Sequence, residues 1–513
     1  MNEFITTSEK SIIERIATIA NAKGIPLRII GGFVRDRLLL ADKRLLTPPK
    51  LEIDFVTTSD AMALAESVAT EFPGARCYTY GHFGTARVDW NQWAFEFATA
   101  RVESYQPDSR NPDVVPASFE EDASRRDFTV NALAWGVGGD ELGVLFDPFH
   151  GIRDLEQGIL RTPLDPEKTF SDDPLRMMRA ARFVAKLDFT LDKTTEAGIR
   201  DQASRISIVH LERIADEFLQ LMAAPKPHLG LRVLIETGVM AQVVPEIMEL
   251  DGVDQRGRHS HKDVLAHTLQ VVENAASLSD DIIVRLGALF HDIAKPATKK
   301  FIPGTGWTFY AHEILGAKMI YRIFRRMRFS NQLSKQVSRI TRLHMRPVHL
   351  SQEGVTDSAV RRLRVDAGED LERLLKLCRA DITSANPARV QQYLHNYELM
   401  VNRLDLVDKR DHLSAFQSPV RGDEISALFG IPSGPRIGMI KTAVEEAILD
   451  GEIENEYETA KRWLLEHKDM FLSQPESRVR RKALHELDER QLERLLTATK
   501  EQHGRDESDE PSE

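Results

Sequence analysis

The stretch LRIIGGFVRD at residues 27–36, followed by LEIDFV at residues 51–56, decides how the first part of the chain folds. The first segment predicts a short buried strand that ends in a glycine-glycine turn and leads into a helix. In the second segment apolar and acidic residues alternate, so Glu52 and Asp54 lie on one face of a strand. Because a glycine turn exposes backbone N–H groups at a helix N-terminus, the first segment predicts a phosphate site.

The two carboxylates extend this prediction to a metal site. Neighbouring carboxylates can hold two Mg²⁺ ions about 3.5–4 Å apart, and Arg35 adds a planar fork for phosphate oxygens. Taken separately, a glycine turn and two acids on a solvated strand face are also ordinary structural features. Their order favours nucleotidyl transfer, in which pyrophosphate leaves. Glu96, on a later strand-like segment, is either a third carboxylate at the metal or a surface residue.

The composition is that of an ordinary globular protein. The 513 residues are 42% hydrophobic and 29% charged, and the net charge of −11 excludes a uniformly basic surface without excluding a local RNA site. Cys77 and Cys378 form no redox or metal-binding motif, which fits a reducing cytoplasm. The first apolar residues are spaced as in an amphipathic helix rather than a secretory leader, and no window resembles a membrane span. We expect a cytoplasmic protein with no membrane partner.

Residues 122–134, DASRRDFTVNALA, place acids and arginines directly before an apolar run. Arg126 suits a triphosphate, and Asp127 is positioned in the sequence to hold it by a charged hydrogen bond. The alternative is that Asp127 caps a helix.

Residues 172–183, DDPLRMMRAARF, place a carboxylate and a guanidinium on adjacent helical turns. Cytosine and adenine each present an amino donor beside a ring-nitrogen acceptor, so Asp173 would accept from the amine and Arg176 would donate to the ring. Uracil reverses this polarity, and unpaired groups in a closed site cost several kcal/mol. The structural alternative is that Asp173 caps a helix whose first residue is Pro174.

A second group of chemically active residues predicts a divalent-metal site. Imidazoles and carboxylates that converge from several helices are suitable ligands; the alternative is a set of separate, hydrogen-bonded histidines. The candidates are His267, His291, Asp292 and Asp381, with His312 and His344 as residues that would widen the site.

In this order, the motifs of the first part resemble those of the class II tRNA nucleotidyltransferase and poly(A) polymerase family. They are GGFVRD, DFVTTSD, FGTA, RRDFTVNALA, DPFHGIRDL, DDPLRMMRAARF and ERIADEF, over about residues 25–220. The segments KDVLAHT, LFHDIAKPAT, HEILGAKM and RADIT resemble the HD domain that is fused to many bacterial members.

The resemblance implies a role for each matching residue. Gly32 and Arg35 would bind nucleotide phosphate, and Glu52 and Asp54 would bind Mg²⁺. The incoming CTP or ATP would lie at Arg126, Asp173, Arg176, Arg179 and Arg182, with Asp173 and Arg176 as the amino-acid template. The ligands of a divalent metal of unknown identity in the HD domain would be His267, His291, Asp292 and Asp381.

One position departs from the family pattern. The family has Asp-x-Asp, whereas this chain has Glu52-Ile53-Asp54. Glutamate is one methylene longer and can still ligate Mg²⁺, but it would have to retract or adopt another rotamer to keep the metal in place. Slower transfer, altered metal preference and loss of activity are all open outcomes.

We therefore predict an α+β protein whose head is a mixed sheet with helices, of the DNA-polymerase-beta-like nucleotidyltransferase type, followed by helical domains. The predicted activity is addition of C and A from CTP and ATP to the 3′ end of tRNA. The alternatives are a CC-only, A-only or poly(A) polymerase, and an HD-site phosphohydrolase as the principal activity. The predicted domains are a head at 1–165, a helical neck at 166–250, an HD domain at 251–385, a helical RNA-binding body at 386–475 and a charged tail at 476–513.

Overall fold

The computed structural model describes residues 1, 3–41, 51–81, 84–104, 113–138, 141–253, 263–303, 306–350, 357–384, 386–411 and 418–473. The chain divides into two compact units, Met1–Met248 with Arg326–Arg328, and Glu249–Arg325 with Phe329–Glu513. The tail predicted at 476–513 lies outside the described residues. No helix in the described ranges is both long and apolar enough to cross a membrane.

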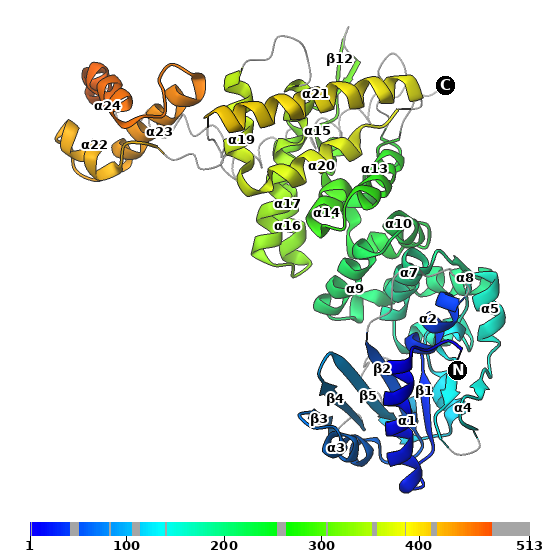
Figure 1. Ribbon diagram of the computed structural model, residues 1–513. Coiled ribbons are helices and arrows are strands. Elements are labelled where there is room, and N and C mark those ends of the chain that lie inside the picture. Colours follow the sequence, from blue (N-terminus) through cyan, green and yellow to red (C-terminus); the bar gives the residue numbers. More distant parts are fainter. Residues whose placement is uncertain are drawn as a thin grey trace, which may run out of the picture. The chain divides into compact units, whose positions relative to one another are not determined.

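The first unit is built on a mixed sheet of seven strands (Figure 1). Strands β2 and β5 run parallel, and every other neighbouring pair in this sheet is antiparallel. In spatial order the strands are β3 (Arg76–Tyr80), β4 (Thr85–Trp90), β5 (Trp93–Thr99), β2 (Glu52–Thr57), β1 (Leu27–Ile30), β8 (Ala134–Gly136) and β9 (Leu145–Phe146).

Helices α1 (Thr7–Ala22) and α3 (Ala61–Glu71) share the main core with this sheet. The apolar stripe of α1, including the fully buried Ile13 and Ile16, packs in the same cluster as Ile53 and Phe55 of β2. Burial of Ile53 and Phe55 turns the alternate residues of β2 to the opposite face. The strand pattern thereby places the two acids outside the core.

The remaining elements of the first unit link the sheet to a group of helices. The helix after the glycine turn is α2 (Gly32–Ala41). The short elements are β6 (Arg101–Ser104), β7 (Asp113–Pro116), α4 (Phe119–Ser124), η2 (Thr129–Asn131), α5 (Gly151–Gln157), β10 (Ile159–Leu160) and β11 (Thr190–Leu191). The helices that follow are α6 (Pro166–Asp172), α7 (Leu175–Leu187), α8 (Lys193–Gln202), η4 (Ala203–Ile208), α9 (Leu211–Ala223), α10 (Pro227–Glu236), α11 (Val239–Val243) and α12 (Pro245–Met248).

The second unit is helical apart from the hairpin β12 (Lys300–Ile302) and β13 (Gly306–Thr308) in its described residues. Its first helices are α13 (Val264–Leu278), α14 (Ile282–Phe290), α15 (Lys295–Thr298), α16 (His312–Arg326), α17 (Asn331–Leu343), α18 (Met345–Leu350), α19 (Asp357–Ala367), η5 (Gly368–Asp370) and α20 (Leu371–Asp381). They are followed by α21 (Pro387–Asp411), α22 (Gly422–Phe429), α23 (Pro435–Asp450), α24 (Tyr457–Glu466) and α25 (Lys468–Ser473). A mixed-sheet head followed by helical regions confirms the predicted fold class.

Candidate active site and metal cluster

Three carboxylates lie on the open face of the sheet. Asp54 pairs in parallel register with Glu96, and Glu52 precedes it by two residues on β2. Burial raises the pKa of Asp54 to about 6, and the charges of Glu96 and Glu52 add to this rise while Arg126 opposes it. A crowded group of carboxylate oxygens is the ligand set that Mg²⁺ prefers. The residues therefore fit the metal that the family resemblance implies.

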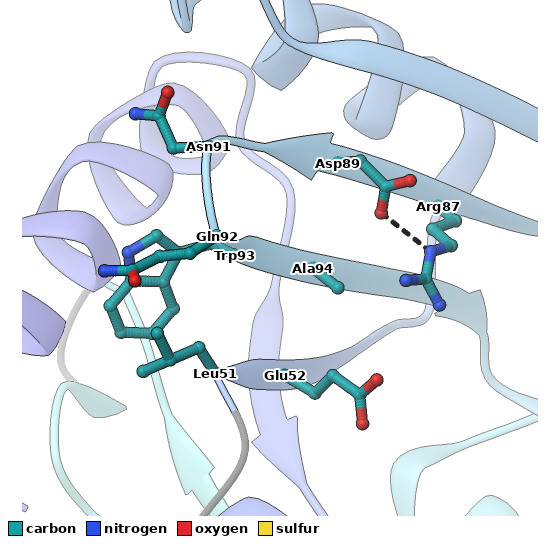
Figure 2. A pocket seen from close by; sticks show the side chains of 8 residues that line it. All are labelled: Leu51, Glu52, Arg87, Asp89, Asn91, Gln92, Trp93 and Ala94. Atoms are coloured by element: carbon teal, nitrogen blue, oxygen red, sulfur yellow. Dashed lines mark hydrogen bonds and ion pairs between the residues drawn. The ribbon is translucent and has the colours of Figure 1, made fainter. Parts of the chain in front are cut away.

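A cavity of about 490 Å³ opens beside Glu52. In Figure 2 the strand that carries Ala94, β5, lies between β2 with Glu52 and β4 with Arg87. Arg87 donates to Asp89 over 2.7 Å and to Glu96 over 3.3 Å. The sequence reasoning did not single out Arg87, although the alternation of β4 was the signal that would have placed it on this face.

The glycine turn adjoins the same carboxylates. Gly31 has φ +81°, a left-handed conformation that favours glycine, and its N–H donates to the Leu133 carbonyl over 3.0 Å. A Cβ at this position would lie 3.4 Å from Arg126 Nη1 and 3.8 Å from Asp54 Oδ2. Helix α2 begins at the next residue, Gly32. The predicted phosphate cradle and the predicted metal face are thus brought into contact.

Arg35 lies inside the protein rather than at an open surface. It is 2% exposed, and its guanidinium donates to Asp36 over 2.7 Å and to Asn131 over 2.5 Å. These bonds join α2 to η2. The guanidinium therefore holds the cradle in place, and its direct contact with phosphate stays a prediction.

The partner predicted for Arg126 was wrong. Asp122, which is fully buried, pairs with Arg126 over 3.3 Å and with Arg125 over 2.6 Å. Asp127 instead accepts from Arg179 Nε over 2.8 Å. The pairing follows from the fold: Arg126 stands two residues after the end of α4 and reaches back to Asp122 on that helix, whereas the Asp127 carboxylate faces Arg179 of α7.

Additional hydrogen bonds fix the carboxylate of the Asp127–Arg179 ion pair. Asp127 Oδ1 accepts from the N–H of Phe128 and from Asn131, each over 2.9 Å. Burial alone would raise the pKa of Asp127, but the Arg179 guanidinium and these hydrogen bonds lower it to about 2. The carboxylate is therefore charged at neutral pH, and Arg179 is fixed in orientation.

A second cavity, of about 240 Å³, brings four of the predicted nucleotide-binding residues together. Asp173 Oδ1 accepts from the N–H of Leu175, the first residue of α7, over 3.2 Å. The structural alternative was one residue off, because Pro174 rather than Asp173 is the N-cap of α7 and Asp173 is the C-cap of α6. Arg176 donates to the carbonyls of Thr169 and Arg125, over 3.4 and 2.6 Å. The cavity is lined by Arg125, Arg126, Asp127, Asp173, Arg176, Arg179 and Arg213.

The last predicted arginine of α7 lies apart from this lining. Arg182 Nε donates to Glu217 Oε2 over 2.6 Å, and the pair joins α7 to α9. Burial lowers the pKa of Arg182, although Glu217 opposes that effect. Arg125 and Arg213 also line the cavity, although neither was among the predicted nucleotide-binding residues. Arg125 belongs to the motif RRDFTVNALA and Arg213 to the motif ERIADEF, so both motifs contained the signal.

The second unit assembles the predicted HD residues from α13, the end of α14 and α20. His267 Nε2 lies 3.0 Å from Asp381 Oδ1, and His291 Nε2 lies 3.1 Å from Asp292 Oδ2 and 3.5 Å from Asp381 Oδ1. Burial would lower the pKa of His291, but the two carboxylates raise it to about 10. This electrostatic environment favours a cation.

The two additional histidines also reach the cluster. His312 Nε2 lies 3.4 Å from Asp292 Oδ1 and 3.4 Å from His344 Nε2. Lys295, which the sequence reasoning did not single out, lies 2.7 Å from Asp292 Oδ2. His291 Nε2 and Asp292 Oδ2 are buried without a well-aligned hydrogen bond among the described residues. A metal ion would satisfy such atoms, so the residues fit one.

Together, the sheet with its carboxylates, the arginine-lined cavity and the histidine cluster define a nucleotidyltransferase that carries an HD domain. The descriptions of the matching family models agree: a poly A polymerase head domain over residues 27–161, a probable RNA and SrmB-binding site of polymerase A over 188–250, and an HD domain over 264–386.

The similarity of this chain to individual proteins shows which family it belongs to. The chain is 33% identical over 348 residues to the A-adding tRNA nucleotidyltransferase of Deinococcus radiodurans, covering 66% of this chain and 77% of the relative. It is 33% identical over 374 residues to the multifunctional CCA protein of Nitrosococcus oceani, covering 69% and 83%. The crystal structure of the Bacillus stearothermophilus CCA-adding enzyme in complex with CTP aligns with TM-score 0.58 and 25% identity, covering 90% and 98%. This chain belongs to the tRNA nucleotidyltransferase family, whose members include the CCA-adding enzymes.

Proposed function

We propose that this enzyme adds C and A from CTP and ATP to the 3′ end of tRNA, as CCA addition or repair. The proposal is supported by the position of Arg126, which connects the arginine-lined cavity with the carboxylates of the sheet in the first unit. Arg126 lines the cavity that holds Asp173 and Arg176, and it also lies beside Gly31 and Asp54. A nucleotide whose base lies in that cavity would have its phosphates directed toward the carboxylates.

Base choice follows from the chemistry of the cavity. Asp173 accepts from the N–H of Leu175 with one carboxylate oxygen, and Arg176 is held by two backbone carbonyls. With the template so positioned, the Asp173 carboxylate accepts from the amino group of cytosine or adenine, and an Arg176 N–H donates to the ring. Uracil offers the reverse pattern and would leave buried groups unpaired. We infer that Arg126 and Arg179 bind the nucleotide at the same cavity, with Gly32 and Arg35 forming and supporting the phosphate cradle.

In the proposed reaction the RNA 3′ oxygen attacks the α-phosphorus, the bond from the α-phosphorus to the bridging oxygen breaks, and pyrophosphate leaves. Glu52 and Asp54 would hold Mg²⁺, with Glu96 as a third carboxylate. Bound there, the metal would lower the pKa of the attacking hydroxyl and neutralise the leaving pyrophosphate. The role of Arg182 is indirect in this proposal, because its guanidinium is bonded to Glu217.

The test is incorporation of labelled CTP and ATP into tRNA that lacks its 3′ end. We expect incorporation by the natural chain with Mg²⁺ and none by Asp54→Ala. Asp216→Ala, at an exposed position on α9, is the matched control and should retain activity. If the natural chain incorporates neither nucleotide, the proposal fails. Sequencing of the 3′ ends made with CTP alone, ATP alone and both separates CCA addition from CC-only, A-only and poly(A) addition.

The assembled HD cluster favours a second candidate function, hydrolysis of phosphoesters by the second unit. Its four predicted ligands converge within hydrogen-bonding distances. If this is the principal activity, His291→Ala abolishes phosphatase activity and Asp54→Ala does not. We further propose a cytoplasmic location and the head, neck, HD and RNA-binding body boundaries predicted above.

A further inference from the structure

The open face of the sheet continues beyond the carboxylates onto β4 and β3. Strand register places Asp54, Glu96, Arg87 and Tyr78 opposite one another on the adjacent strands β2, β5, β4 and β3. Directly opposed residues of neighbouring strands lie on the same face of a sheet. Val88, the next residue of β4, is buried in the core on the other face. Arg87 and Tyr78 therefore share the face that carries the carboxylates.

The position of the phosphate cradle sets the direction from which RNA reaches these carboxylates. Gly31 and Arg126 adjoin Asp54 at the end of β1, so the leaving pyrophosphate of the proposed reaction belongs on that side. In phosphoryl transfer the attacking and leaving oxygens lie on opposite sides of the phosphorus. Strands β5 and β4 flank β2 on the side away from β1. The RNA 3′ oxygen would therefore approach over β5 and β4, where Glu96 and Arg87 lie.

This side of the site offers both space and a guanidinium. The cavity of about 490 Å³ beside Glu52 is lined by Arg87, Asp89 and Ala94, and its size suits a nucleotide. The Arg87 side chain is 36% exposed. Its Nε donates to Asp89 (Figure 2) and its Nη1 to Glu96, which orients the guanidinium. Within the described part of the chain Nη2 has no hydrogen-bond partner, so its N–H groups are available to a phosphate oxygen.

The edge strand β3 favours a nucleic acid strand as the occupant rather than a small anion. Tyr78 and Tyr80 are 43% and 53% exposed, and register places them opposite Arg87 and Thr85. Exposed aromatic rings beside a basic residue are typical of sites for unpaired nucleotides, because bases stack on the rings while the cation binds the backbone. The arrangement therefore matches a single-stranded RNA end.

We propose that Arg87 binds the phosphate that joins the last two nucleotides of the RNA, and that this contact directs the terminal 3′ oxygen toward the carboxylates. Strands β4 and β2 are two strand spacings apart, about 10 Å. One nucleotide can therefore extend from a phosphate at the Arg87 guanidinium to a 3′ oxygen at Asp54. This assignment rests on the proposed function and names a residue that holds its RNA substrate.

The experiment combines Arg87→Ala with a modified RNA in a binding cycle. Fluorescent tRNA that lacks its CCA end is titrated with the full chain in Mg²⁺ without CTP or ATP, so no transfer takes place. A methylphosphonate at the last linkage removes the charge of that phosphate. We expect Arg87→Ala and the methylphosphonate each to raise Kd about tenfold. Together they should raise Kd no further than either change alone.

Two controls are matched to these changes. Lys23→Ala removes an exposed positive charge at the end of α1, on the helix-covered face of the sheet, and should leave Kd unchanged. A methylphosphonate in the middle of the acceptor stem should affect the natural chain and Arg87→Ala equally. Circular dichroism reports whether each variant is folded, and Arg87→Gln, which keeps most of the side-chain length, should reproduce the result of Arg87→Ala.

An unchanged Kd in both Arg87 variants would overturn the proposal. So would independent, multiplying effects of the Arg87 variants and the terminal methylphosphonate, because groups in contact cannot act independently. Incorporation of labelled CTP and ATP is measured separately. A natural chain that shows the coupling but incorporates no nucleotide refutes the proposed function alone, whereas incorporation without the coupling refutes only the assignment of Arg87.

Discussion

Replacement of Asp127 by asparagine should remove a pH-dependent contribution to the stability of the first unit. Asp127 is 7% exposed and accepts two hydrogen bonds from Arg179, over 2.8 and 2.5 Å. Asparagine still accepts from Phe128 N–H and Asn131, but its amide group would face the Arg179 donors. The half-buried guanidinium of Arg179 is then left without its carboxylate.

The magnitude follows from the pKa of Asp127, which falls from 3.8 to about 2 on folding. At about 1.4 kcal/mol per pKa unit, the charged form contributes about 2 kcal/mol to the free energy of unfolding. Because the folded-state pKa is lowered, this stability is fully present above the unfolded pKa and is lost as pH falls toward 2. About half of it should be gone by pH 3.

The assay is urea unfolding of the natural chain and of Asp127→Asn at several pH values between 3 and 7, with the first unit followed by hydrogen-exchange mass spectrometry. Subtracting the free energy of unfolding of Asp127→Asn from that of the natural chain at each pH removes the contributions of the titrating groups that the two proteins share. We expect a stability difference that shrinks by about 1 kcal/mol between pH 6 and pH 3. Curves that run parallel over this range would show that the Asp127–Arg179 pair does not act as the structure indicates.

Three further outcomes follow. Glu52→Asp should preserve or raise nucleotide incorporation, whereas Glu52→Ala should lower it about 100-fold or more, since the metal supplies several kcal/mol; indifference to the alanine variant would refute the metal role. Gly230→Ala should destabilise the first unit by about 1–3 kcal/mol in urea titrations, because the added Cβ would lie 2.4 Å from the Ala181 carbonyl oxygen. The control is Gly438→Ala, which should not destabilise the chain because no atom lies within 4 Å of the added Cβ. Asp122→Asn should raise KM for CTP and ATP alike, about tenfold, because it releases Arg126 without touching Asp173; a change in the ratio of C to A would contradict this.

The strand pattern was sufficient to predict much of the head. Alternation in LEIDFV places Ile53 and Phe55 in the core and Glu52 and Asp54 outside it, and the glycine turn precedes a helix as predicted. These features depend on neighbours along the chain, which is why sequence alone reveals them. The grouping of His267, His291, Asp292 and Asp381 was also predictable, because imidazoles and carboxylates that recur on several helices can converge on one cluster. Their binding of a metal stays a prediction.

Pairings between distant segments could not be read from the sequence. The residues around Asp127 in the sequence do not show that its ion-pair partner is Arg179, fifty-two positions away. Likewise, the sequence around Arg182 does not show that it pairs with Glu217. Nor does the motif containing Arg35 show that its guanidinium becomes buried against Asn131. Each of these depends on how α2, α7 and α9 pack, and packing is decided by the whole core rather than by spacing.

The sequence by itself determined the chemistry available to this protein: a glycine turn, paired acids, an acid-arginine pair and a group of histidines. The tertiary structure decided which of these groups act together. It brought Gly31, Arg126 and Asp54 into one site, and it turned the two oxygens of Asp292 toward different histidines. The physical reason is that residue type sets what a side chain can bind, whereas only the packed backbone sets the distances and orientations at which it does so.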